Sequence, residues 1–166
     1  MPELLTERLR LRPLRVDDAE RLLAIYSHPL AVPWTGAHTL SEIRAEIAFY
    51  AGFEAEHGWS MRGIELRATG ELIGDCGIVP LELKGPELEL MYDLHPGFWG
   101  RGLASEAVGA VLDAGFGETG AEQIIAVAKP TNAASLRILA KFAFAADGTM
   151  HAYDEDLLRF VRRAHA

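Results

Sequence analysis

A glycine-rich turn between a strand and a helix is the part of this sequence best suited to chemistry. The segment Met91–Ala107 reads M-Y-D-L-H-P-G-F-W-G-R-G-L-A-S-E-A, in which a strand stops at Pro96 and a helix follows the last glycine. Glycines let main-chain amides approach a ligand closely, and the first turn of a helix presents four unpaired N–H groups. Together with the helix dipole, these groups predict a binding site for a phosphate or pyrophosphate.

Along the chain, the spacing of hydrophobic residues alternates between that of helices and that of strands. Alternating leucines and arginines over residues 8–14 predict a strand. A helix is expected from Asp17 or Asp18 to Tyr26, and residues 33–38 are expected to form a loop. A second helix starts at Ser41 or Thr39. Strands are expected over 59–66, 72–79, 87–94 and 123–128, helices after Gly102 and over 132–141, and two strands over 144–163 around a turn at 147–148.

The resulting order is β-α-α-β-β-β-α-β-α-β-β. Antiparallel strands come first and a β-α-β unit follows the glycine turn, so we expect an α+β fold with a mixed, mostly antiparallel central sheet flanked by helices. The 166 residues are expected to form a single domain, 1–166.

Composition narrows the class of protein. The chain is 49% hydrophobic and 24% charged, which is typical of a globular protein. No apolar run approaches a membrane span, and the charged N-terminus does not resemble a signal peptide, so a cytoplasmic protein is expected. With 24 acidic and 16 basic residues, nucleic-acid binding is not expected. The acidity would attract a cationic partner or serve solubility alone.

Cysteine and histidine usage gives no sign of a metal centre. The single cysteine, Cys76, excludes an internal disulfide framework, and its apolar surroundings predict a buried core residue. No two of the six histidines have metal-ligand spacing, so no metal is expected; they are His28, His38, His57, His95, His151 and His165.

Three separated segments resemble the GNAT acetyltransferase superfamily, and in particular its branch of ribosomal-protein N-terminal acetyltransferases. The first is T-E-R-L-R-L-R-P-L with Asp17, similar to the opening strand of that branch. The second, Leu94 to Ala107, resembles its P-x-[FY]-W-G-[KR]-G-x-A-[ST]-E-A acetyl-CoA motif. The third, N-A-A-S-L-R-I-L-A-K-F-A-F from Asn132, resembles the N-x-x-S helix of the family. The closing strand Y-D-E-D-L-L-R-F-V-R-R extends the resemblance over nearly the whole chain.

The sequence departs from the superfamily at two positions. Trp99 stands where the wider superfamily has Gln or Arg, although tryptophan is usual in this branch. Ala143 replaces a glycine usually found near the end of the N-x-x-S helix, so that helix terminus is expected to differ in shape. Neither change removes a main-chain amide from the glycine turn.

The resemblance implies acetyl-CoA as cosubstrate, with its pyrophosphate on the backbone N–H groups of the glycine turn. Arg101 could add a charge-assisted contact, and Leu94 would present main-chain groups to the pantetheine arm. Asn132 and Ser135 stand at a helix start, where capping and, for Asn132, cofactor contact are compatible. The residues implied in cofactor binding are Leu94, Trp99, Gly100, Arg101, Gly102, Leu103, Ala104, Ser105 and Asn132.

The implied reaction is direct attack of a primary amine on the acetyl thioester, so the partner is an amine, either a small molecule or a protein N-terminus. At pH 7 only about 1 lysine amine in 2,500 is neutral, against roughly 1 α-amine in 10. Glu89, in the strand ahead of the turn, is the first candidate base and Glu87 the second; solvent-facing strand carboxylates are the alternative. Tyr153 and Ser135 are candidate acids for the leaving thiolate.

Other readings remain open at this stage. A noncatalytic acyl-CoA-binding or sensing domain would keep the glycine turn without turnover. A Rossmann domain fits poorly, because Leu-Ala-Ser follows the second glycine and antiparallel strands precede it. The acceptor opening is expected near 33–42, where Trp34 could contact an amine by cation–π interaction or simply pack. The sequence leaves a homodimer open.

Overall fold

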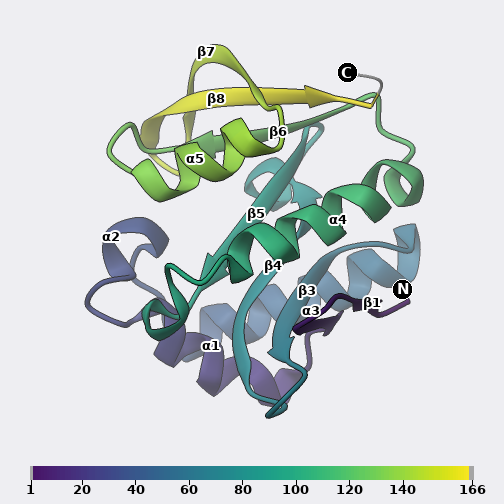
Figure 1. Ribbon diagram of the computed structural model, residues 1–166, viewed down its shortest axis with the longest axis vertical. Helices are drawn as coiled ribbons and strands as arrows, with labels where there is room; N and C mark the ends of the chain where they lie inside the picture. Colours follow the sequence, from purple (N-terminus) through teal and green to yellow (C-terminus); the bar gives the residue numbers. More distant parts are fainter. Residues whose placement is uncertain (1, 165–166) are drawn as a thin grey trace.

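A computed structural model of the protein describes residues 2–164; His165, one of the histidines noted above, lies outside this range. Within these residues, eight strands form one sheet in the order β1-β2-β3-β4-β5-β6-β8-β7 (Figure 1). The strands are β1 (Leu4–Leu5), β2 (Leu9–Pro13), β3 (Met61–Leu66), β4 (Leu72–Pro80), β5 (Leu88–Leu94), β6 (Gln123–Ala128), β7 (Ala145–Ala152) and β8 (Glu155–Arg163). The helices are α1 (Ala19–Tyr26), α2 (Val32–Thr35), α3 (Leu40–His57), α4 (Leu103–Thr119) and α5 (Ala133–Lys141).

The sheet is mixed and mostly antiparallel, as the sequence predicts. Every neighbouring pair of strands is antiparallel except β5 and β6, which are parallel. This one parallel pair is joined through α4, which is the β-α-β unit expected after the glycine turn. The α+β fold class is therefore confirmed.

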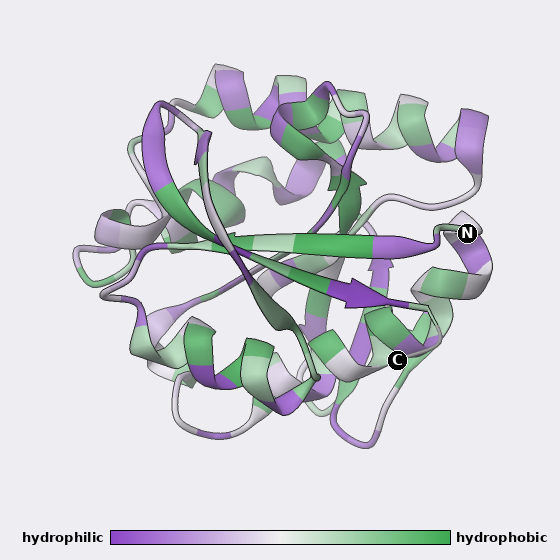
Figure 2. Ribbon diagram, turned by 90° about the horizontal axis from the view of Figure 1, so that it is seen from above, coloured by the Kyte–Doolittle hydropathy of each residue, from purple (hydrophilic) through white to green (hydrophobic). Residues whose placement is uncertain are grey.

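Helices cover both faces of the sheet, and each face has its own apolar cluster. Along β5, Leu90 and Leu94 pack in the cluster that α4 and α5 complete, whereas Met91 packs toward the cluster of α1 and α3. This alternation follows from the two-residue period of a strand. Figure 2 shows apolar stretches along the strands in the middle of the molecule, with hydrophilic and hydrophobic residues alternating along the helices.

The sheet opens between β5 and β6. β5 pairs with β4 over its whole length, from Leu88 to Leu94, whereas its pairing with β6 is the single bridge between Glu89 and Ile125. In Figure 1 the β6–β8–β7 part of the sheet and α5 lie apart from the lower end of β5. The divergence leaves the backbone of β5 beyond Glu89 without β6 beside it.

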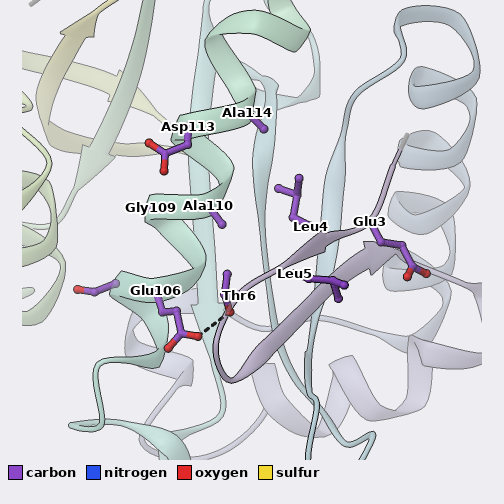
Figure 3. A pocket seen from close by; sticks show the side chains of 10 residues that line it. Glu3, Leu4, Leu5, Thr6, Glu106, Gly109, Ala110, Asp113 and Ala114 are labelled. Atoms are coloured by element: carbon purple, nitrogen blue, oxygen red, sulfur yellow. Dashed lines mark hydrogen bonds between the residues drawn. The ribbon is translucent and has the colours of Figure 1, made fainter.

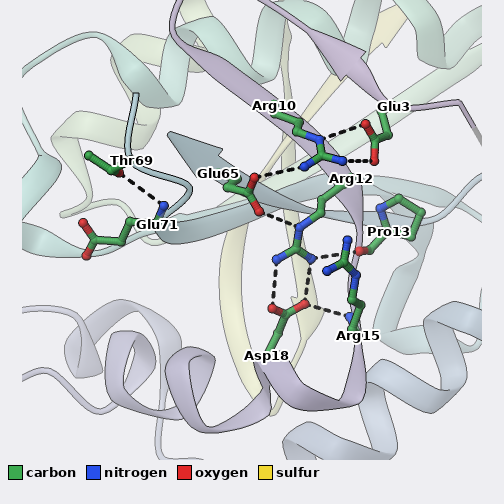
Figure 4. A network of polar contacts seen from close by, with 9 residues as sticks. All are labelled: Glu3, Arg10, Arg12, Pro13, Arg15, Asp18, Glu65, Thr69 and Glu71. Atoms are coloured by element: carbon green, nitrogen blue, oxygen red, sulfur yellow. Dashed lines mark hydrogen bonds and ion pairs between the residues drawn. The ribbon is translucent and has the colours of Figure 1, made fainter. Parts of the chain in front are cut away.

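A buried ion-pair network fixes the N-terminal strand to the first helix (Figure 4). Arg12 is 5% exposed, and its guanidinium contacts Asp18 at 2.8 Å and Glu65 at 2.7 Å. Asp18 also accepts a hydrogen bond from the backbone N–H of Arg15, which begins the short 3₁₀ turn before α1. A buried arginine needs such partners, so the arginines of the opening strand have a structural task.

Several local expectations need correction. The segment 33–38 is not wholly a loop, because α2 covers Val32–Thr35, and the chain has an additional short strand, β1. α3 begins after Thr39, whose hydroxyl accepts a hydrogen bond from the N–H of Glu42, and not at Ser41. Asp18 precedes α1 without a side-chain cap on it.

The turn between the last two strands is also elsewhere than expected. The sequence prediction of a turn at Asp147–Gly148 is wrong: β7 runs through these residues, and the pairing register shifts between Ala146 and Thr149. The reversal lies at Tyr153 and Asp154, whose φ values are +54° and +59°. Two consecutive left-handed residues make the tight hairpin turn that matches strand twist, here without glycine. Gly148, with φ of +77°, serves the irregularity in register instead.

None of the helices in the described part of the chain is long and apolar enough to cross a membrane.

Candidate active site

The glycine turn forms an uncapped helix start. Gly100 and Gly102 have φ values of +74° and +77°, a left-handed conformation that glycine adopts without steric cost. Gly102 is the N-cap of α4 and supplies no side-chain cap, so the first N–H groups of α4 lack a capping side chain. We refer to residues Gly100–Ser105 as the phosphate loop. Its exposed backbone donors and the dipole of a 17-residue helix fit a pyrophosphate group.

Trp99 shapes the approach to this loop. Its indole Nε1 donates a hydrogen bond of 2.8 Å to the carbonyl oxygen of Leu94, the last residue of β5. Trp99 is 43% exposed, although its indole N–H is engaged. Leu94 itself is buried, and its backbone lies on the open side of the β5–β6 divergence.

Arg8 is a residue near the phosphate loop that the sequence analysis did not single out. Its Nη1 donates to the carbonyl oxygen of Arg101 at 2.9 Å, and its Nε contacts Glu106 at 2.7 Å. Glu106 also accepts a hydrogen bond from Thr6, so β1 and β2 are tied to the first turn of α4 (Figure 3). The groove in Figure 3 lies between β1 and α4, and Ser105 lines it together with Glu106. The T-E-R start of the opening strand was the signal that could have revealed this contact.

The N-x-x-S helix, α5, faces the opening from the other side. The side chain of Asn132 accepts a hydrogen bond from the N–H of Ser135 at 3.1 Å, which confirms the capping role. The hydroxyl of Ser135 lies 2.6 Å from the phenol oxygen of Tyr92 in β5, and this contact spans the divergence. Cofactor contact by Asn132 stays a prediction.

Glu89 occupies the point where the strands part. The side chain is buried, at 3% exposure, and accepts a hydrogen bond of 2.5 Å from the hydroxyl of Tyr153. Burial raises the pKa of Glu89 to about 7, aided by the charge of Glu82 and opposed by the Tyr153 hydrogen bond. A carboxyl group with a pKa near the working pH is suited to take up a proton.

Tyr153 is held against Glu89 by a second turn. The N–H of Tyr153 donates to a carboxylate oxygen of Glu82 at 2.8 Å, and the N–H of Glu82 donates to the Tyr153 hydroxyl at 3.2 Å. Glu82 has a φ of +53° and Tyr153 one of +54°, so two segments in the left-handed conformation are joined here by reciprocal hydrogen bonds. The pKa of Tyr153 is raised, first by burial and then by the charge of Glu89.

The three candidate catalytic side chains do not form one cluster. Glu89 and Tyr153 are in contact, whereas Ser135 pairs with Tyr92, whose side chain lies on the α4 and α5 face with Leu90. Glu87, the second candidate base, forms an ion pair with Arg159 of β8. Glu87 is therefore engaged with a basic side chain, whereas Glu89 has no arginine or lysine partner among the described residues.

Two aspartates that the sequence analysis passed over also lie on the α1 and α3 face. Asp75 of β4 stands directly opposite Asp93 of β5, and alternation places both on the side of Met91 and Glu89. Burial raises the pKa of Asp75 to about 7, although the hydroxyl of Tyr26 donates to it. The pKa of Asp93 is raised well above its ordinary value by burial and then by the charge of Asp75. A charged residue inside the apolar run L-I-G-D-C-G-I-V was the signal available in the sequence.

The segment expected to border the acceptor opening does approach these residues. The ring of His38 packs on Tyr26 with centroids 5.2 Å apart, and its Nδ1 lies 3.9 Å from Glu46 of α3. Trp34, on α2, is 38% exposed. Lys129 contacts Glu155 and the carbonyl oxygen of Pro33, each at 3.0 Å. We refer to Glu46, Asp75, Glu89 and Asp93 together as the acidic face.

Cys76 is a core residue, as the sequence predicts, with 0% exposure. Burial raises the pKa of its thiol well above the ordinary value, so the reactive thiolate is disfavoured. Among residues 2–164, no group of three or more His, Cys, Asp or Glu side chains is arranged to hold a metal ion.

The fold and this site define an N-acetyltransferase of the GNAT type. A family model described as an acetyltransferase (GNAT) domain matches residues 8–145, and the chain therefore belongs to the GNAT acetyltransferase family. The chain is 35% identical over 155 residues to the uncharacterized N-acetyltransferase YoaA of Bacillus subtilis (strain 168), covering 92% of this chain and 88% of that protein.

Two further proteins are similar over nearly their whole length. The uncharacterized N-acetyltransferase p20 of Bacillus licheniformis is 31% identical over 164 residues, covering 97% of this chain and 92% of that protein. The crystal structure of an acetyltransferase from Agrobacterium tumefaciens str. C58 superposes with a TM-score of 0.84 at 29% identity, covering 98% of this chain and 95% of the other.

Proposed function

We propose that this protein transfers the acetyl group of acetyl-CoA to a primary amine, and that residues 1–166 act as one catalytic domain. The observation that carries the proposal is the position of Glu89. This buried carboxyl group, with a pKa of about 7, belongs to the one residue pair that joins β5 to β6, so it stands where the sheet opens. The opening lies between the phosphate loop on one side and the acidic face on the other.

The phosphate loop would hold the pyrophosphate of the cosubstrate. Its left-handed glycines and uncapped N–H groups supply donors, and Arg101, exposed on the loop, adds a positive charge. When bound, acetyl-CoA supplies the activated acetyl thioester. Support for this cosubstrate comes from an aminoglycoside acetyltransferase and an N-acetyltransferase of ribosomal protein L7/L12, both solved with coenzyme A and sharing the fold at TM-scores of 0.78.

Glu89 would act as the general base. A protonated amine loses one proton to the carboxylate, which releases it to solvent, and the neutral nitrogen attacks the acetyl carbon. The carbon–sulfur bond breaks as the carbon–nitrogen bond forms, and the second proton lost by the nitrogen balances the one that the departing thiolate takes up. The hydrogen bond from Tyr153 orients the carboxylate but lowers its pKa, while burial raises it. The resulting pKa of about 7 lets the carboxyl group of Glu89 accept a proton at neutral pH and release it afterwards.

The departing thiolate requires a proton, and one pair of hydroxyls and one further hydroxyl are candidate donors. Ser135 and Tyr92 face the opening from the α5 side, and Tyr153 faces it from the β7–β8 turn. A thiol has an ordinary pKa near 8.5, so a weak donor or water suffices. We assign the Ser135–Tyr92 pair to this step, because Tyr153 is already engaged with Glu89.

A noncatalytic sensor of acyl-CoA is the alternative that the sequence left open. A sensor needs the phosphate loop but no buried carboxyl group of raised pKa at the divergence. The presence of Glu89 with its bonded Tyr153 therefore favours the enzyme.

Thiol release provides the test. Acetyl-CoA is incubated with a panel of primary amines and peptides with free N-termini, and free thiol is measured together with the mass of the product. The proposal expects thiol release that depends on the amine. Coenzyme A at ~100 times its Kd should also add about 2.7 kcal/mol to the free energy of unfolding. Binding of coenzyme A without thiol release for every amine would favour the sensor.

The finer assignments made from the motifs stay predictions. These are the ribosomal-protein branch of the family, a cytoplasmic location and a homodimer. An acceptor that is a protein N-terminus and one that is a small molecule are separated by the same panel.

A further inference from the structure

Two carboxylates of the acidic face stand side by side without a basic partner. Asp75 and Asp93 are directly opposed on β4 and β5, and opposed residues of antiparallel strands have Cβ atoms about 4.5–5.5 Å apart. Asp75 is 2% exposed, whereas Asp93 keeps part of its surface open. Like charges in this arrangement destabilise a sheet, so the pair requires a proton or a cation.

Two partly buried carboxylates elsewhere in the protein are paired with buried arginines, whereas Asp75 and Asp93 are not. Asp18 contacts Arg12 at 2.8 Å, and Glu118 contacts the buried Arg62 at 2.6 Å. The charged groups that act most strongly on the pKa of Asp93 are instead all acids: Asp75, Glu89 and Glu46. The fold therefore concentrates negative charge at this place. Neither aspartate has an ion pair with arginine or lysine among the described residues, and the basic side chain that acts on Asp75 is His38.

Asp75 also has an unsatisfied oxygen. Its Oδ2 accepts a hydrogen bond from the hydroxyl of Tyr26, whereas its buried Oδ1 has no hydrogen-bond partner within the described residues. Leaving a buried carboxylate oxygen unpaired is unfavourable. An ammonium group brings three N–H donors and a positive charge, which is the complement of this pair.

The surroundings suit an organic cation better than a metal ion. Tyr26 and Tyr50 are buried beside the aspartates, and His38 packs on Tyr26. No three His, Cys, Asp or Glu side chains among residues 2–164 are placed to hold a metal ion. The groups available to a ligand here are the two carboxylates and the neighbouring aromatic rings. Aromatic rings with carboxylates are a combination that binds alkylammonium groups.

We propose that Asp93, with Asp75 behind it, binds a second ammonium group of the acceptor, so that the preferred acceptors are linear diamines or polyamines. This inference rests on the proposed acetyl transfer at Glu89. Glu89 and Asp93 lie on the same side of β5 four residues apart, which is roughly 13 Å of strand. One amine of the acceptor would reach Glu89 while the other stays protonated at Asp93.

The first experiment compares amines on the unmodified protein. Acetylation rates are measured for linear diamines with three to ten methylene groups and for monoamines of the same chain length. We expect kcat/KM to be about ten- to a hundredfold higher for the best diamine, mainly through a lower KM, since a charged hydrogen bond is being added. Equal kcat/KM for diamines and monoamines would overturn the inference.

The second experiment uses matched variants. Asp93→Asn should remove the preference for diamines by raising their KM, with little change for monoamines, and Asp93→Glu should restore part of it. Asp17→Asn, the same change at an exposed aspartate, is the control and should keep the preference. An unchanged preference in Asp93→Asn and in Asp75→Asn would show that the pair only binds a proton.

Direct binding separates this inference from the proposed function. Calorimetry with the best-fitting diamine and with coenzyme A is carried out on the same variants without any turnover. If no amine is acetylated, the proposed function fails, but diamine binding to the unmodified protein that is lost in Asp93→Asn would still support the cation site. If amines are acetylated and diamines bind no better than monoamines, this inference alone is overturned.

Discussion

The phosphate loop and the acidic face, in our proposal, bind their ligands by different means. The loop uses backbone N–H groups on consecutive residues, is exposed to solvent, and depends on two glycines in the left-handed conformation. The acidic face uses side chains from α3, β4 and β5, most of them buried, with pKa values that burial raises. The donor site is thus local in sequence, while the acceptor side exists only after folding.

The difference predicts that the donor site tolerates sequence change better than the acceptor side. Backbone contacts to a pyrophosphate hardly depend on side-chain identity, so they persist when the sequence changes. The side chains of β4 and β5 that face the acceptor can be substituted without changing the backbone of the phosphate loop. In this protein the acidic face holds four acids, Glu46, Asp75, Glu89 and Asp93, none of which has an ion pair with arginine or lysine among the described residues.

The largest expected effect is on the acidic face. Glu89→Gln removes the base while keeping the size and hydrogen-bonding capacity of the side chain, and should lower kcat by about 10²–10⁴. In the unmodified protein, kcat should rise with pH through about 7 as Glu89 loses its proton. Glu87→Gln is the matched control, because Glu87 is an ion-paired carboxylate two residues away. A pH profile that keeps the same rise in Glu89→Gln would assign the base elsewhere.

The next effect concerns the phosphate loop. Gly102→Ala forces an L-residue to adopt φ near +77°, which costs about 1–2 kcal/mol. We expect about a tenfold weaker affinity for coenzyme A by calorimetry, because the loop would shift its N–H groups to relieve the strain. Gly117→Ala, in an open position of the same helix, should leave the affinity unchanged. Equal affinities in both variants would mean that the glycine conformation does not matter for binding.

A third prediction uses stability instead of activity. The pKa values of Asp75 and Asp93 are raised in the folded protein, so their protonation favours folding at low pH and this contribution is lost as the pH rises toward about 7 for Asp75. Asp93→Asn should flatten this decline and stabilise the protein at pH 8 by on the order of 1–3 kcal/mol. Chemical denaturation at several pH values measures it. Glu46, Glu89, Tyr26 and His38 face the same place and are unchanged in the variant.

The smallest effect should come from the contact that ties β2 to the phosphate loop. Glu106→Gln weakens its links to Thr6 and to the partly exposed Arg8. Because exposed ion pairs contribute about 0–1 kcal/mol, we expect at most a few-fold loss of affinity for coenzyme A. Asp113→Asn, on the same helix, serves as the control. A loss as large as that in Gly102→Ala would show that Arg8 takes part in binding directly.

The sequence predicts the fold well where periodicity and turns are local. The antiparallel strands, the parallel β5–β6 connection and the helix after Gly102 all follow from residue patterns. The hairpin was misplaced because Asp147–Gly148 is a typical turn pair, whereas Tyr153–Asp154 is not. Only the contact with Glu82 and Glu89 explains why the reversal lies at Tyr153.

The site was predictable to the same extent. The phosphate loop could be proposed from its glycines and from the resemblance, and Glu89 from its place before the loop; the structure adds the left-handed glycines and the burial of Glu89, while their roles stay predictions. Asp75 and Asp93 could not be paired from sequence, because their proximity depends on the register between β4 and β5. Tyr92 and Ser135 likewise meet only across the opened sheet.

A crystal structure with coenzyme A bound tests the central claim most directly. Our account predicts the pyrophosphate on the N–H groups of Gly100–Ser105 and the thiol in the β5–β6 opening, within reach of a water or amine held by Glu89. A thiol outside the β5–β6 opening and out of reach of Glu89, or a pyrophosphate away from the glycines, would contradict it.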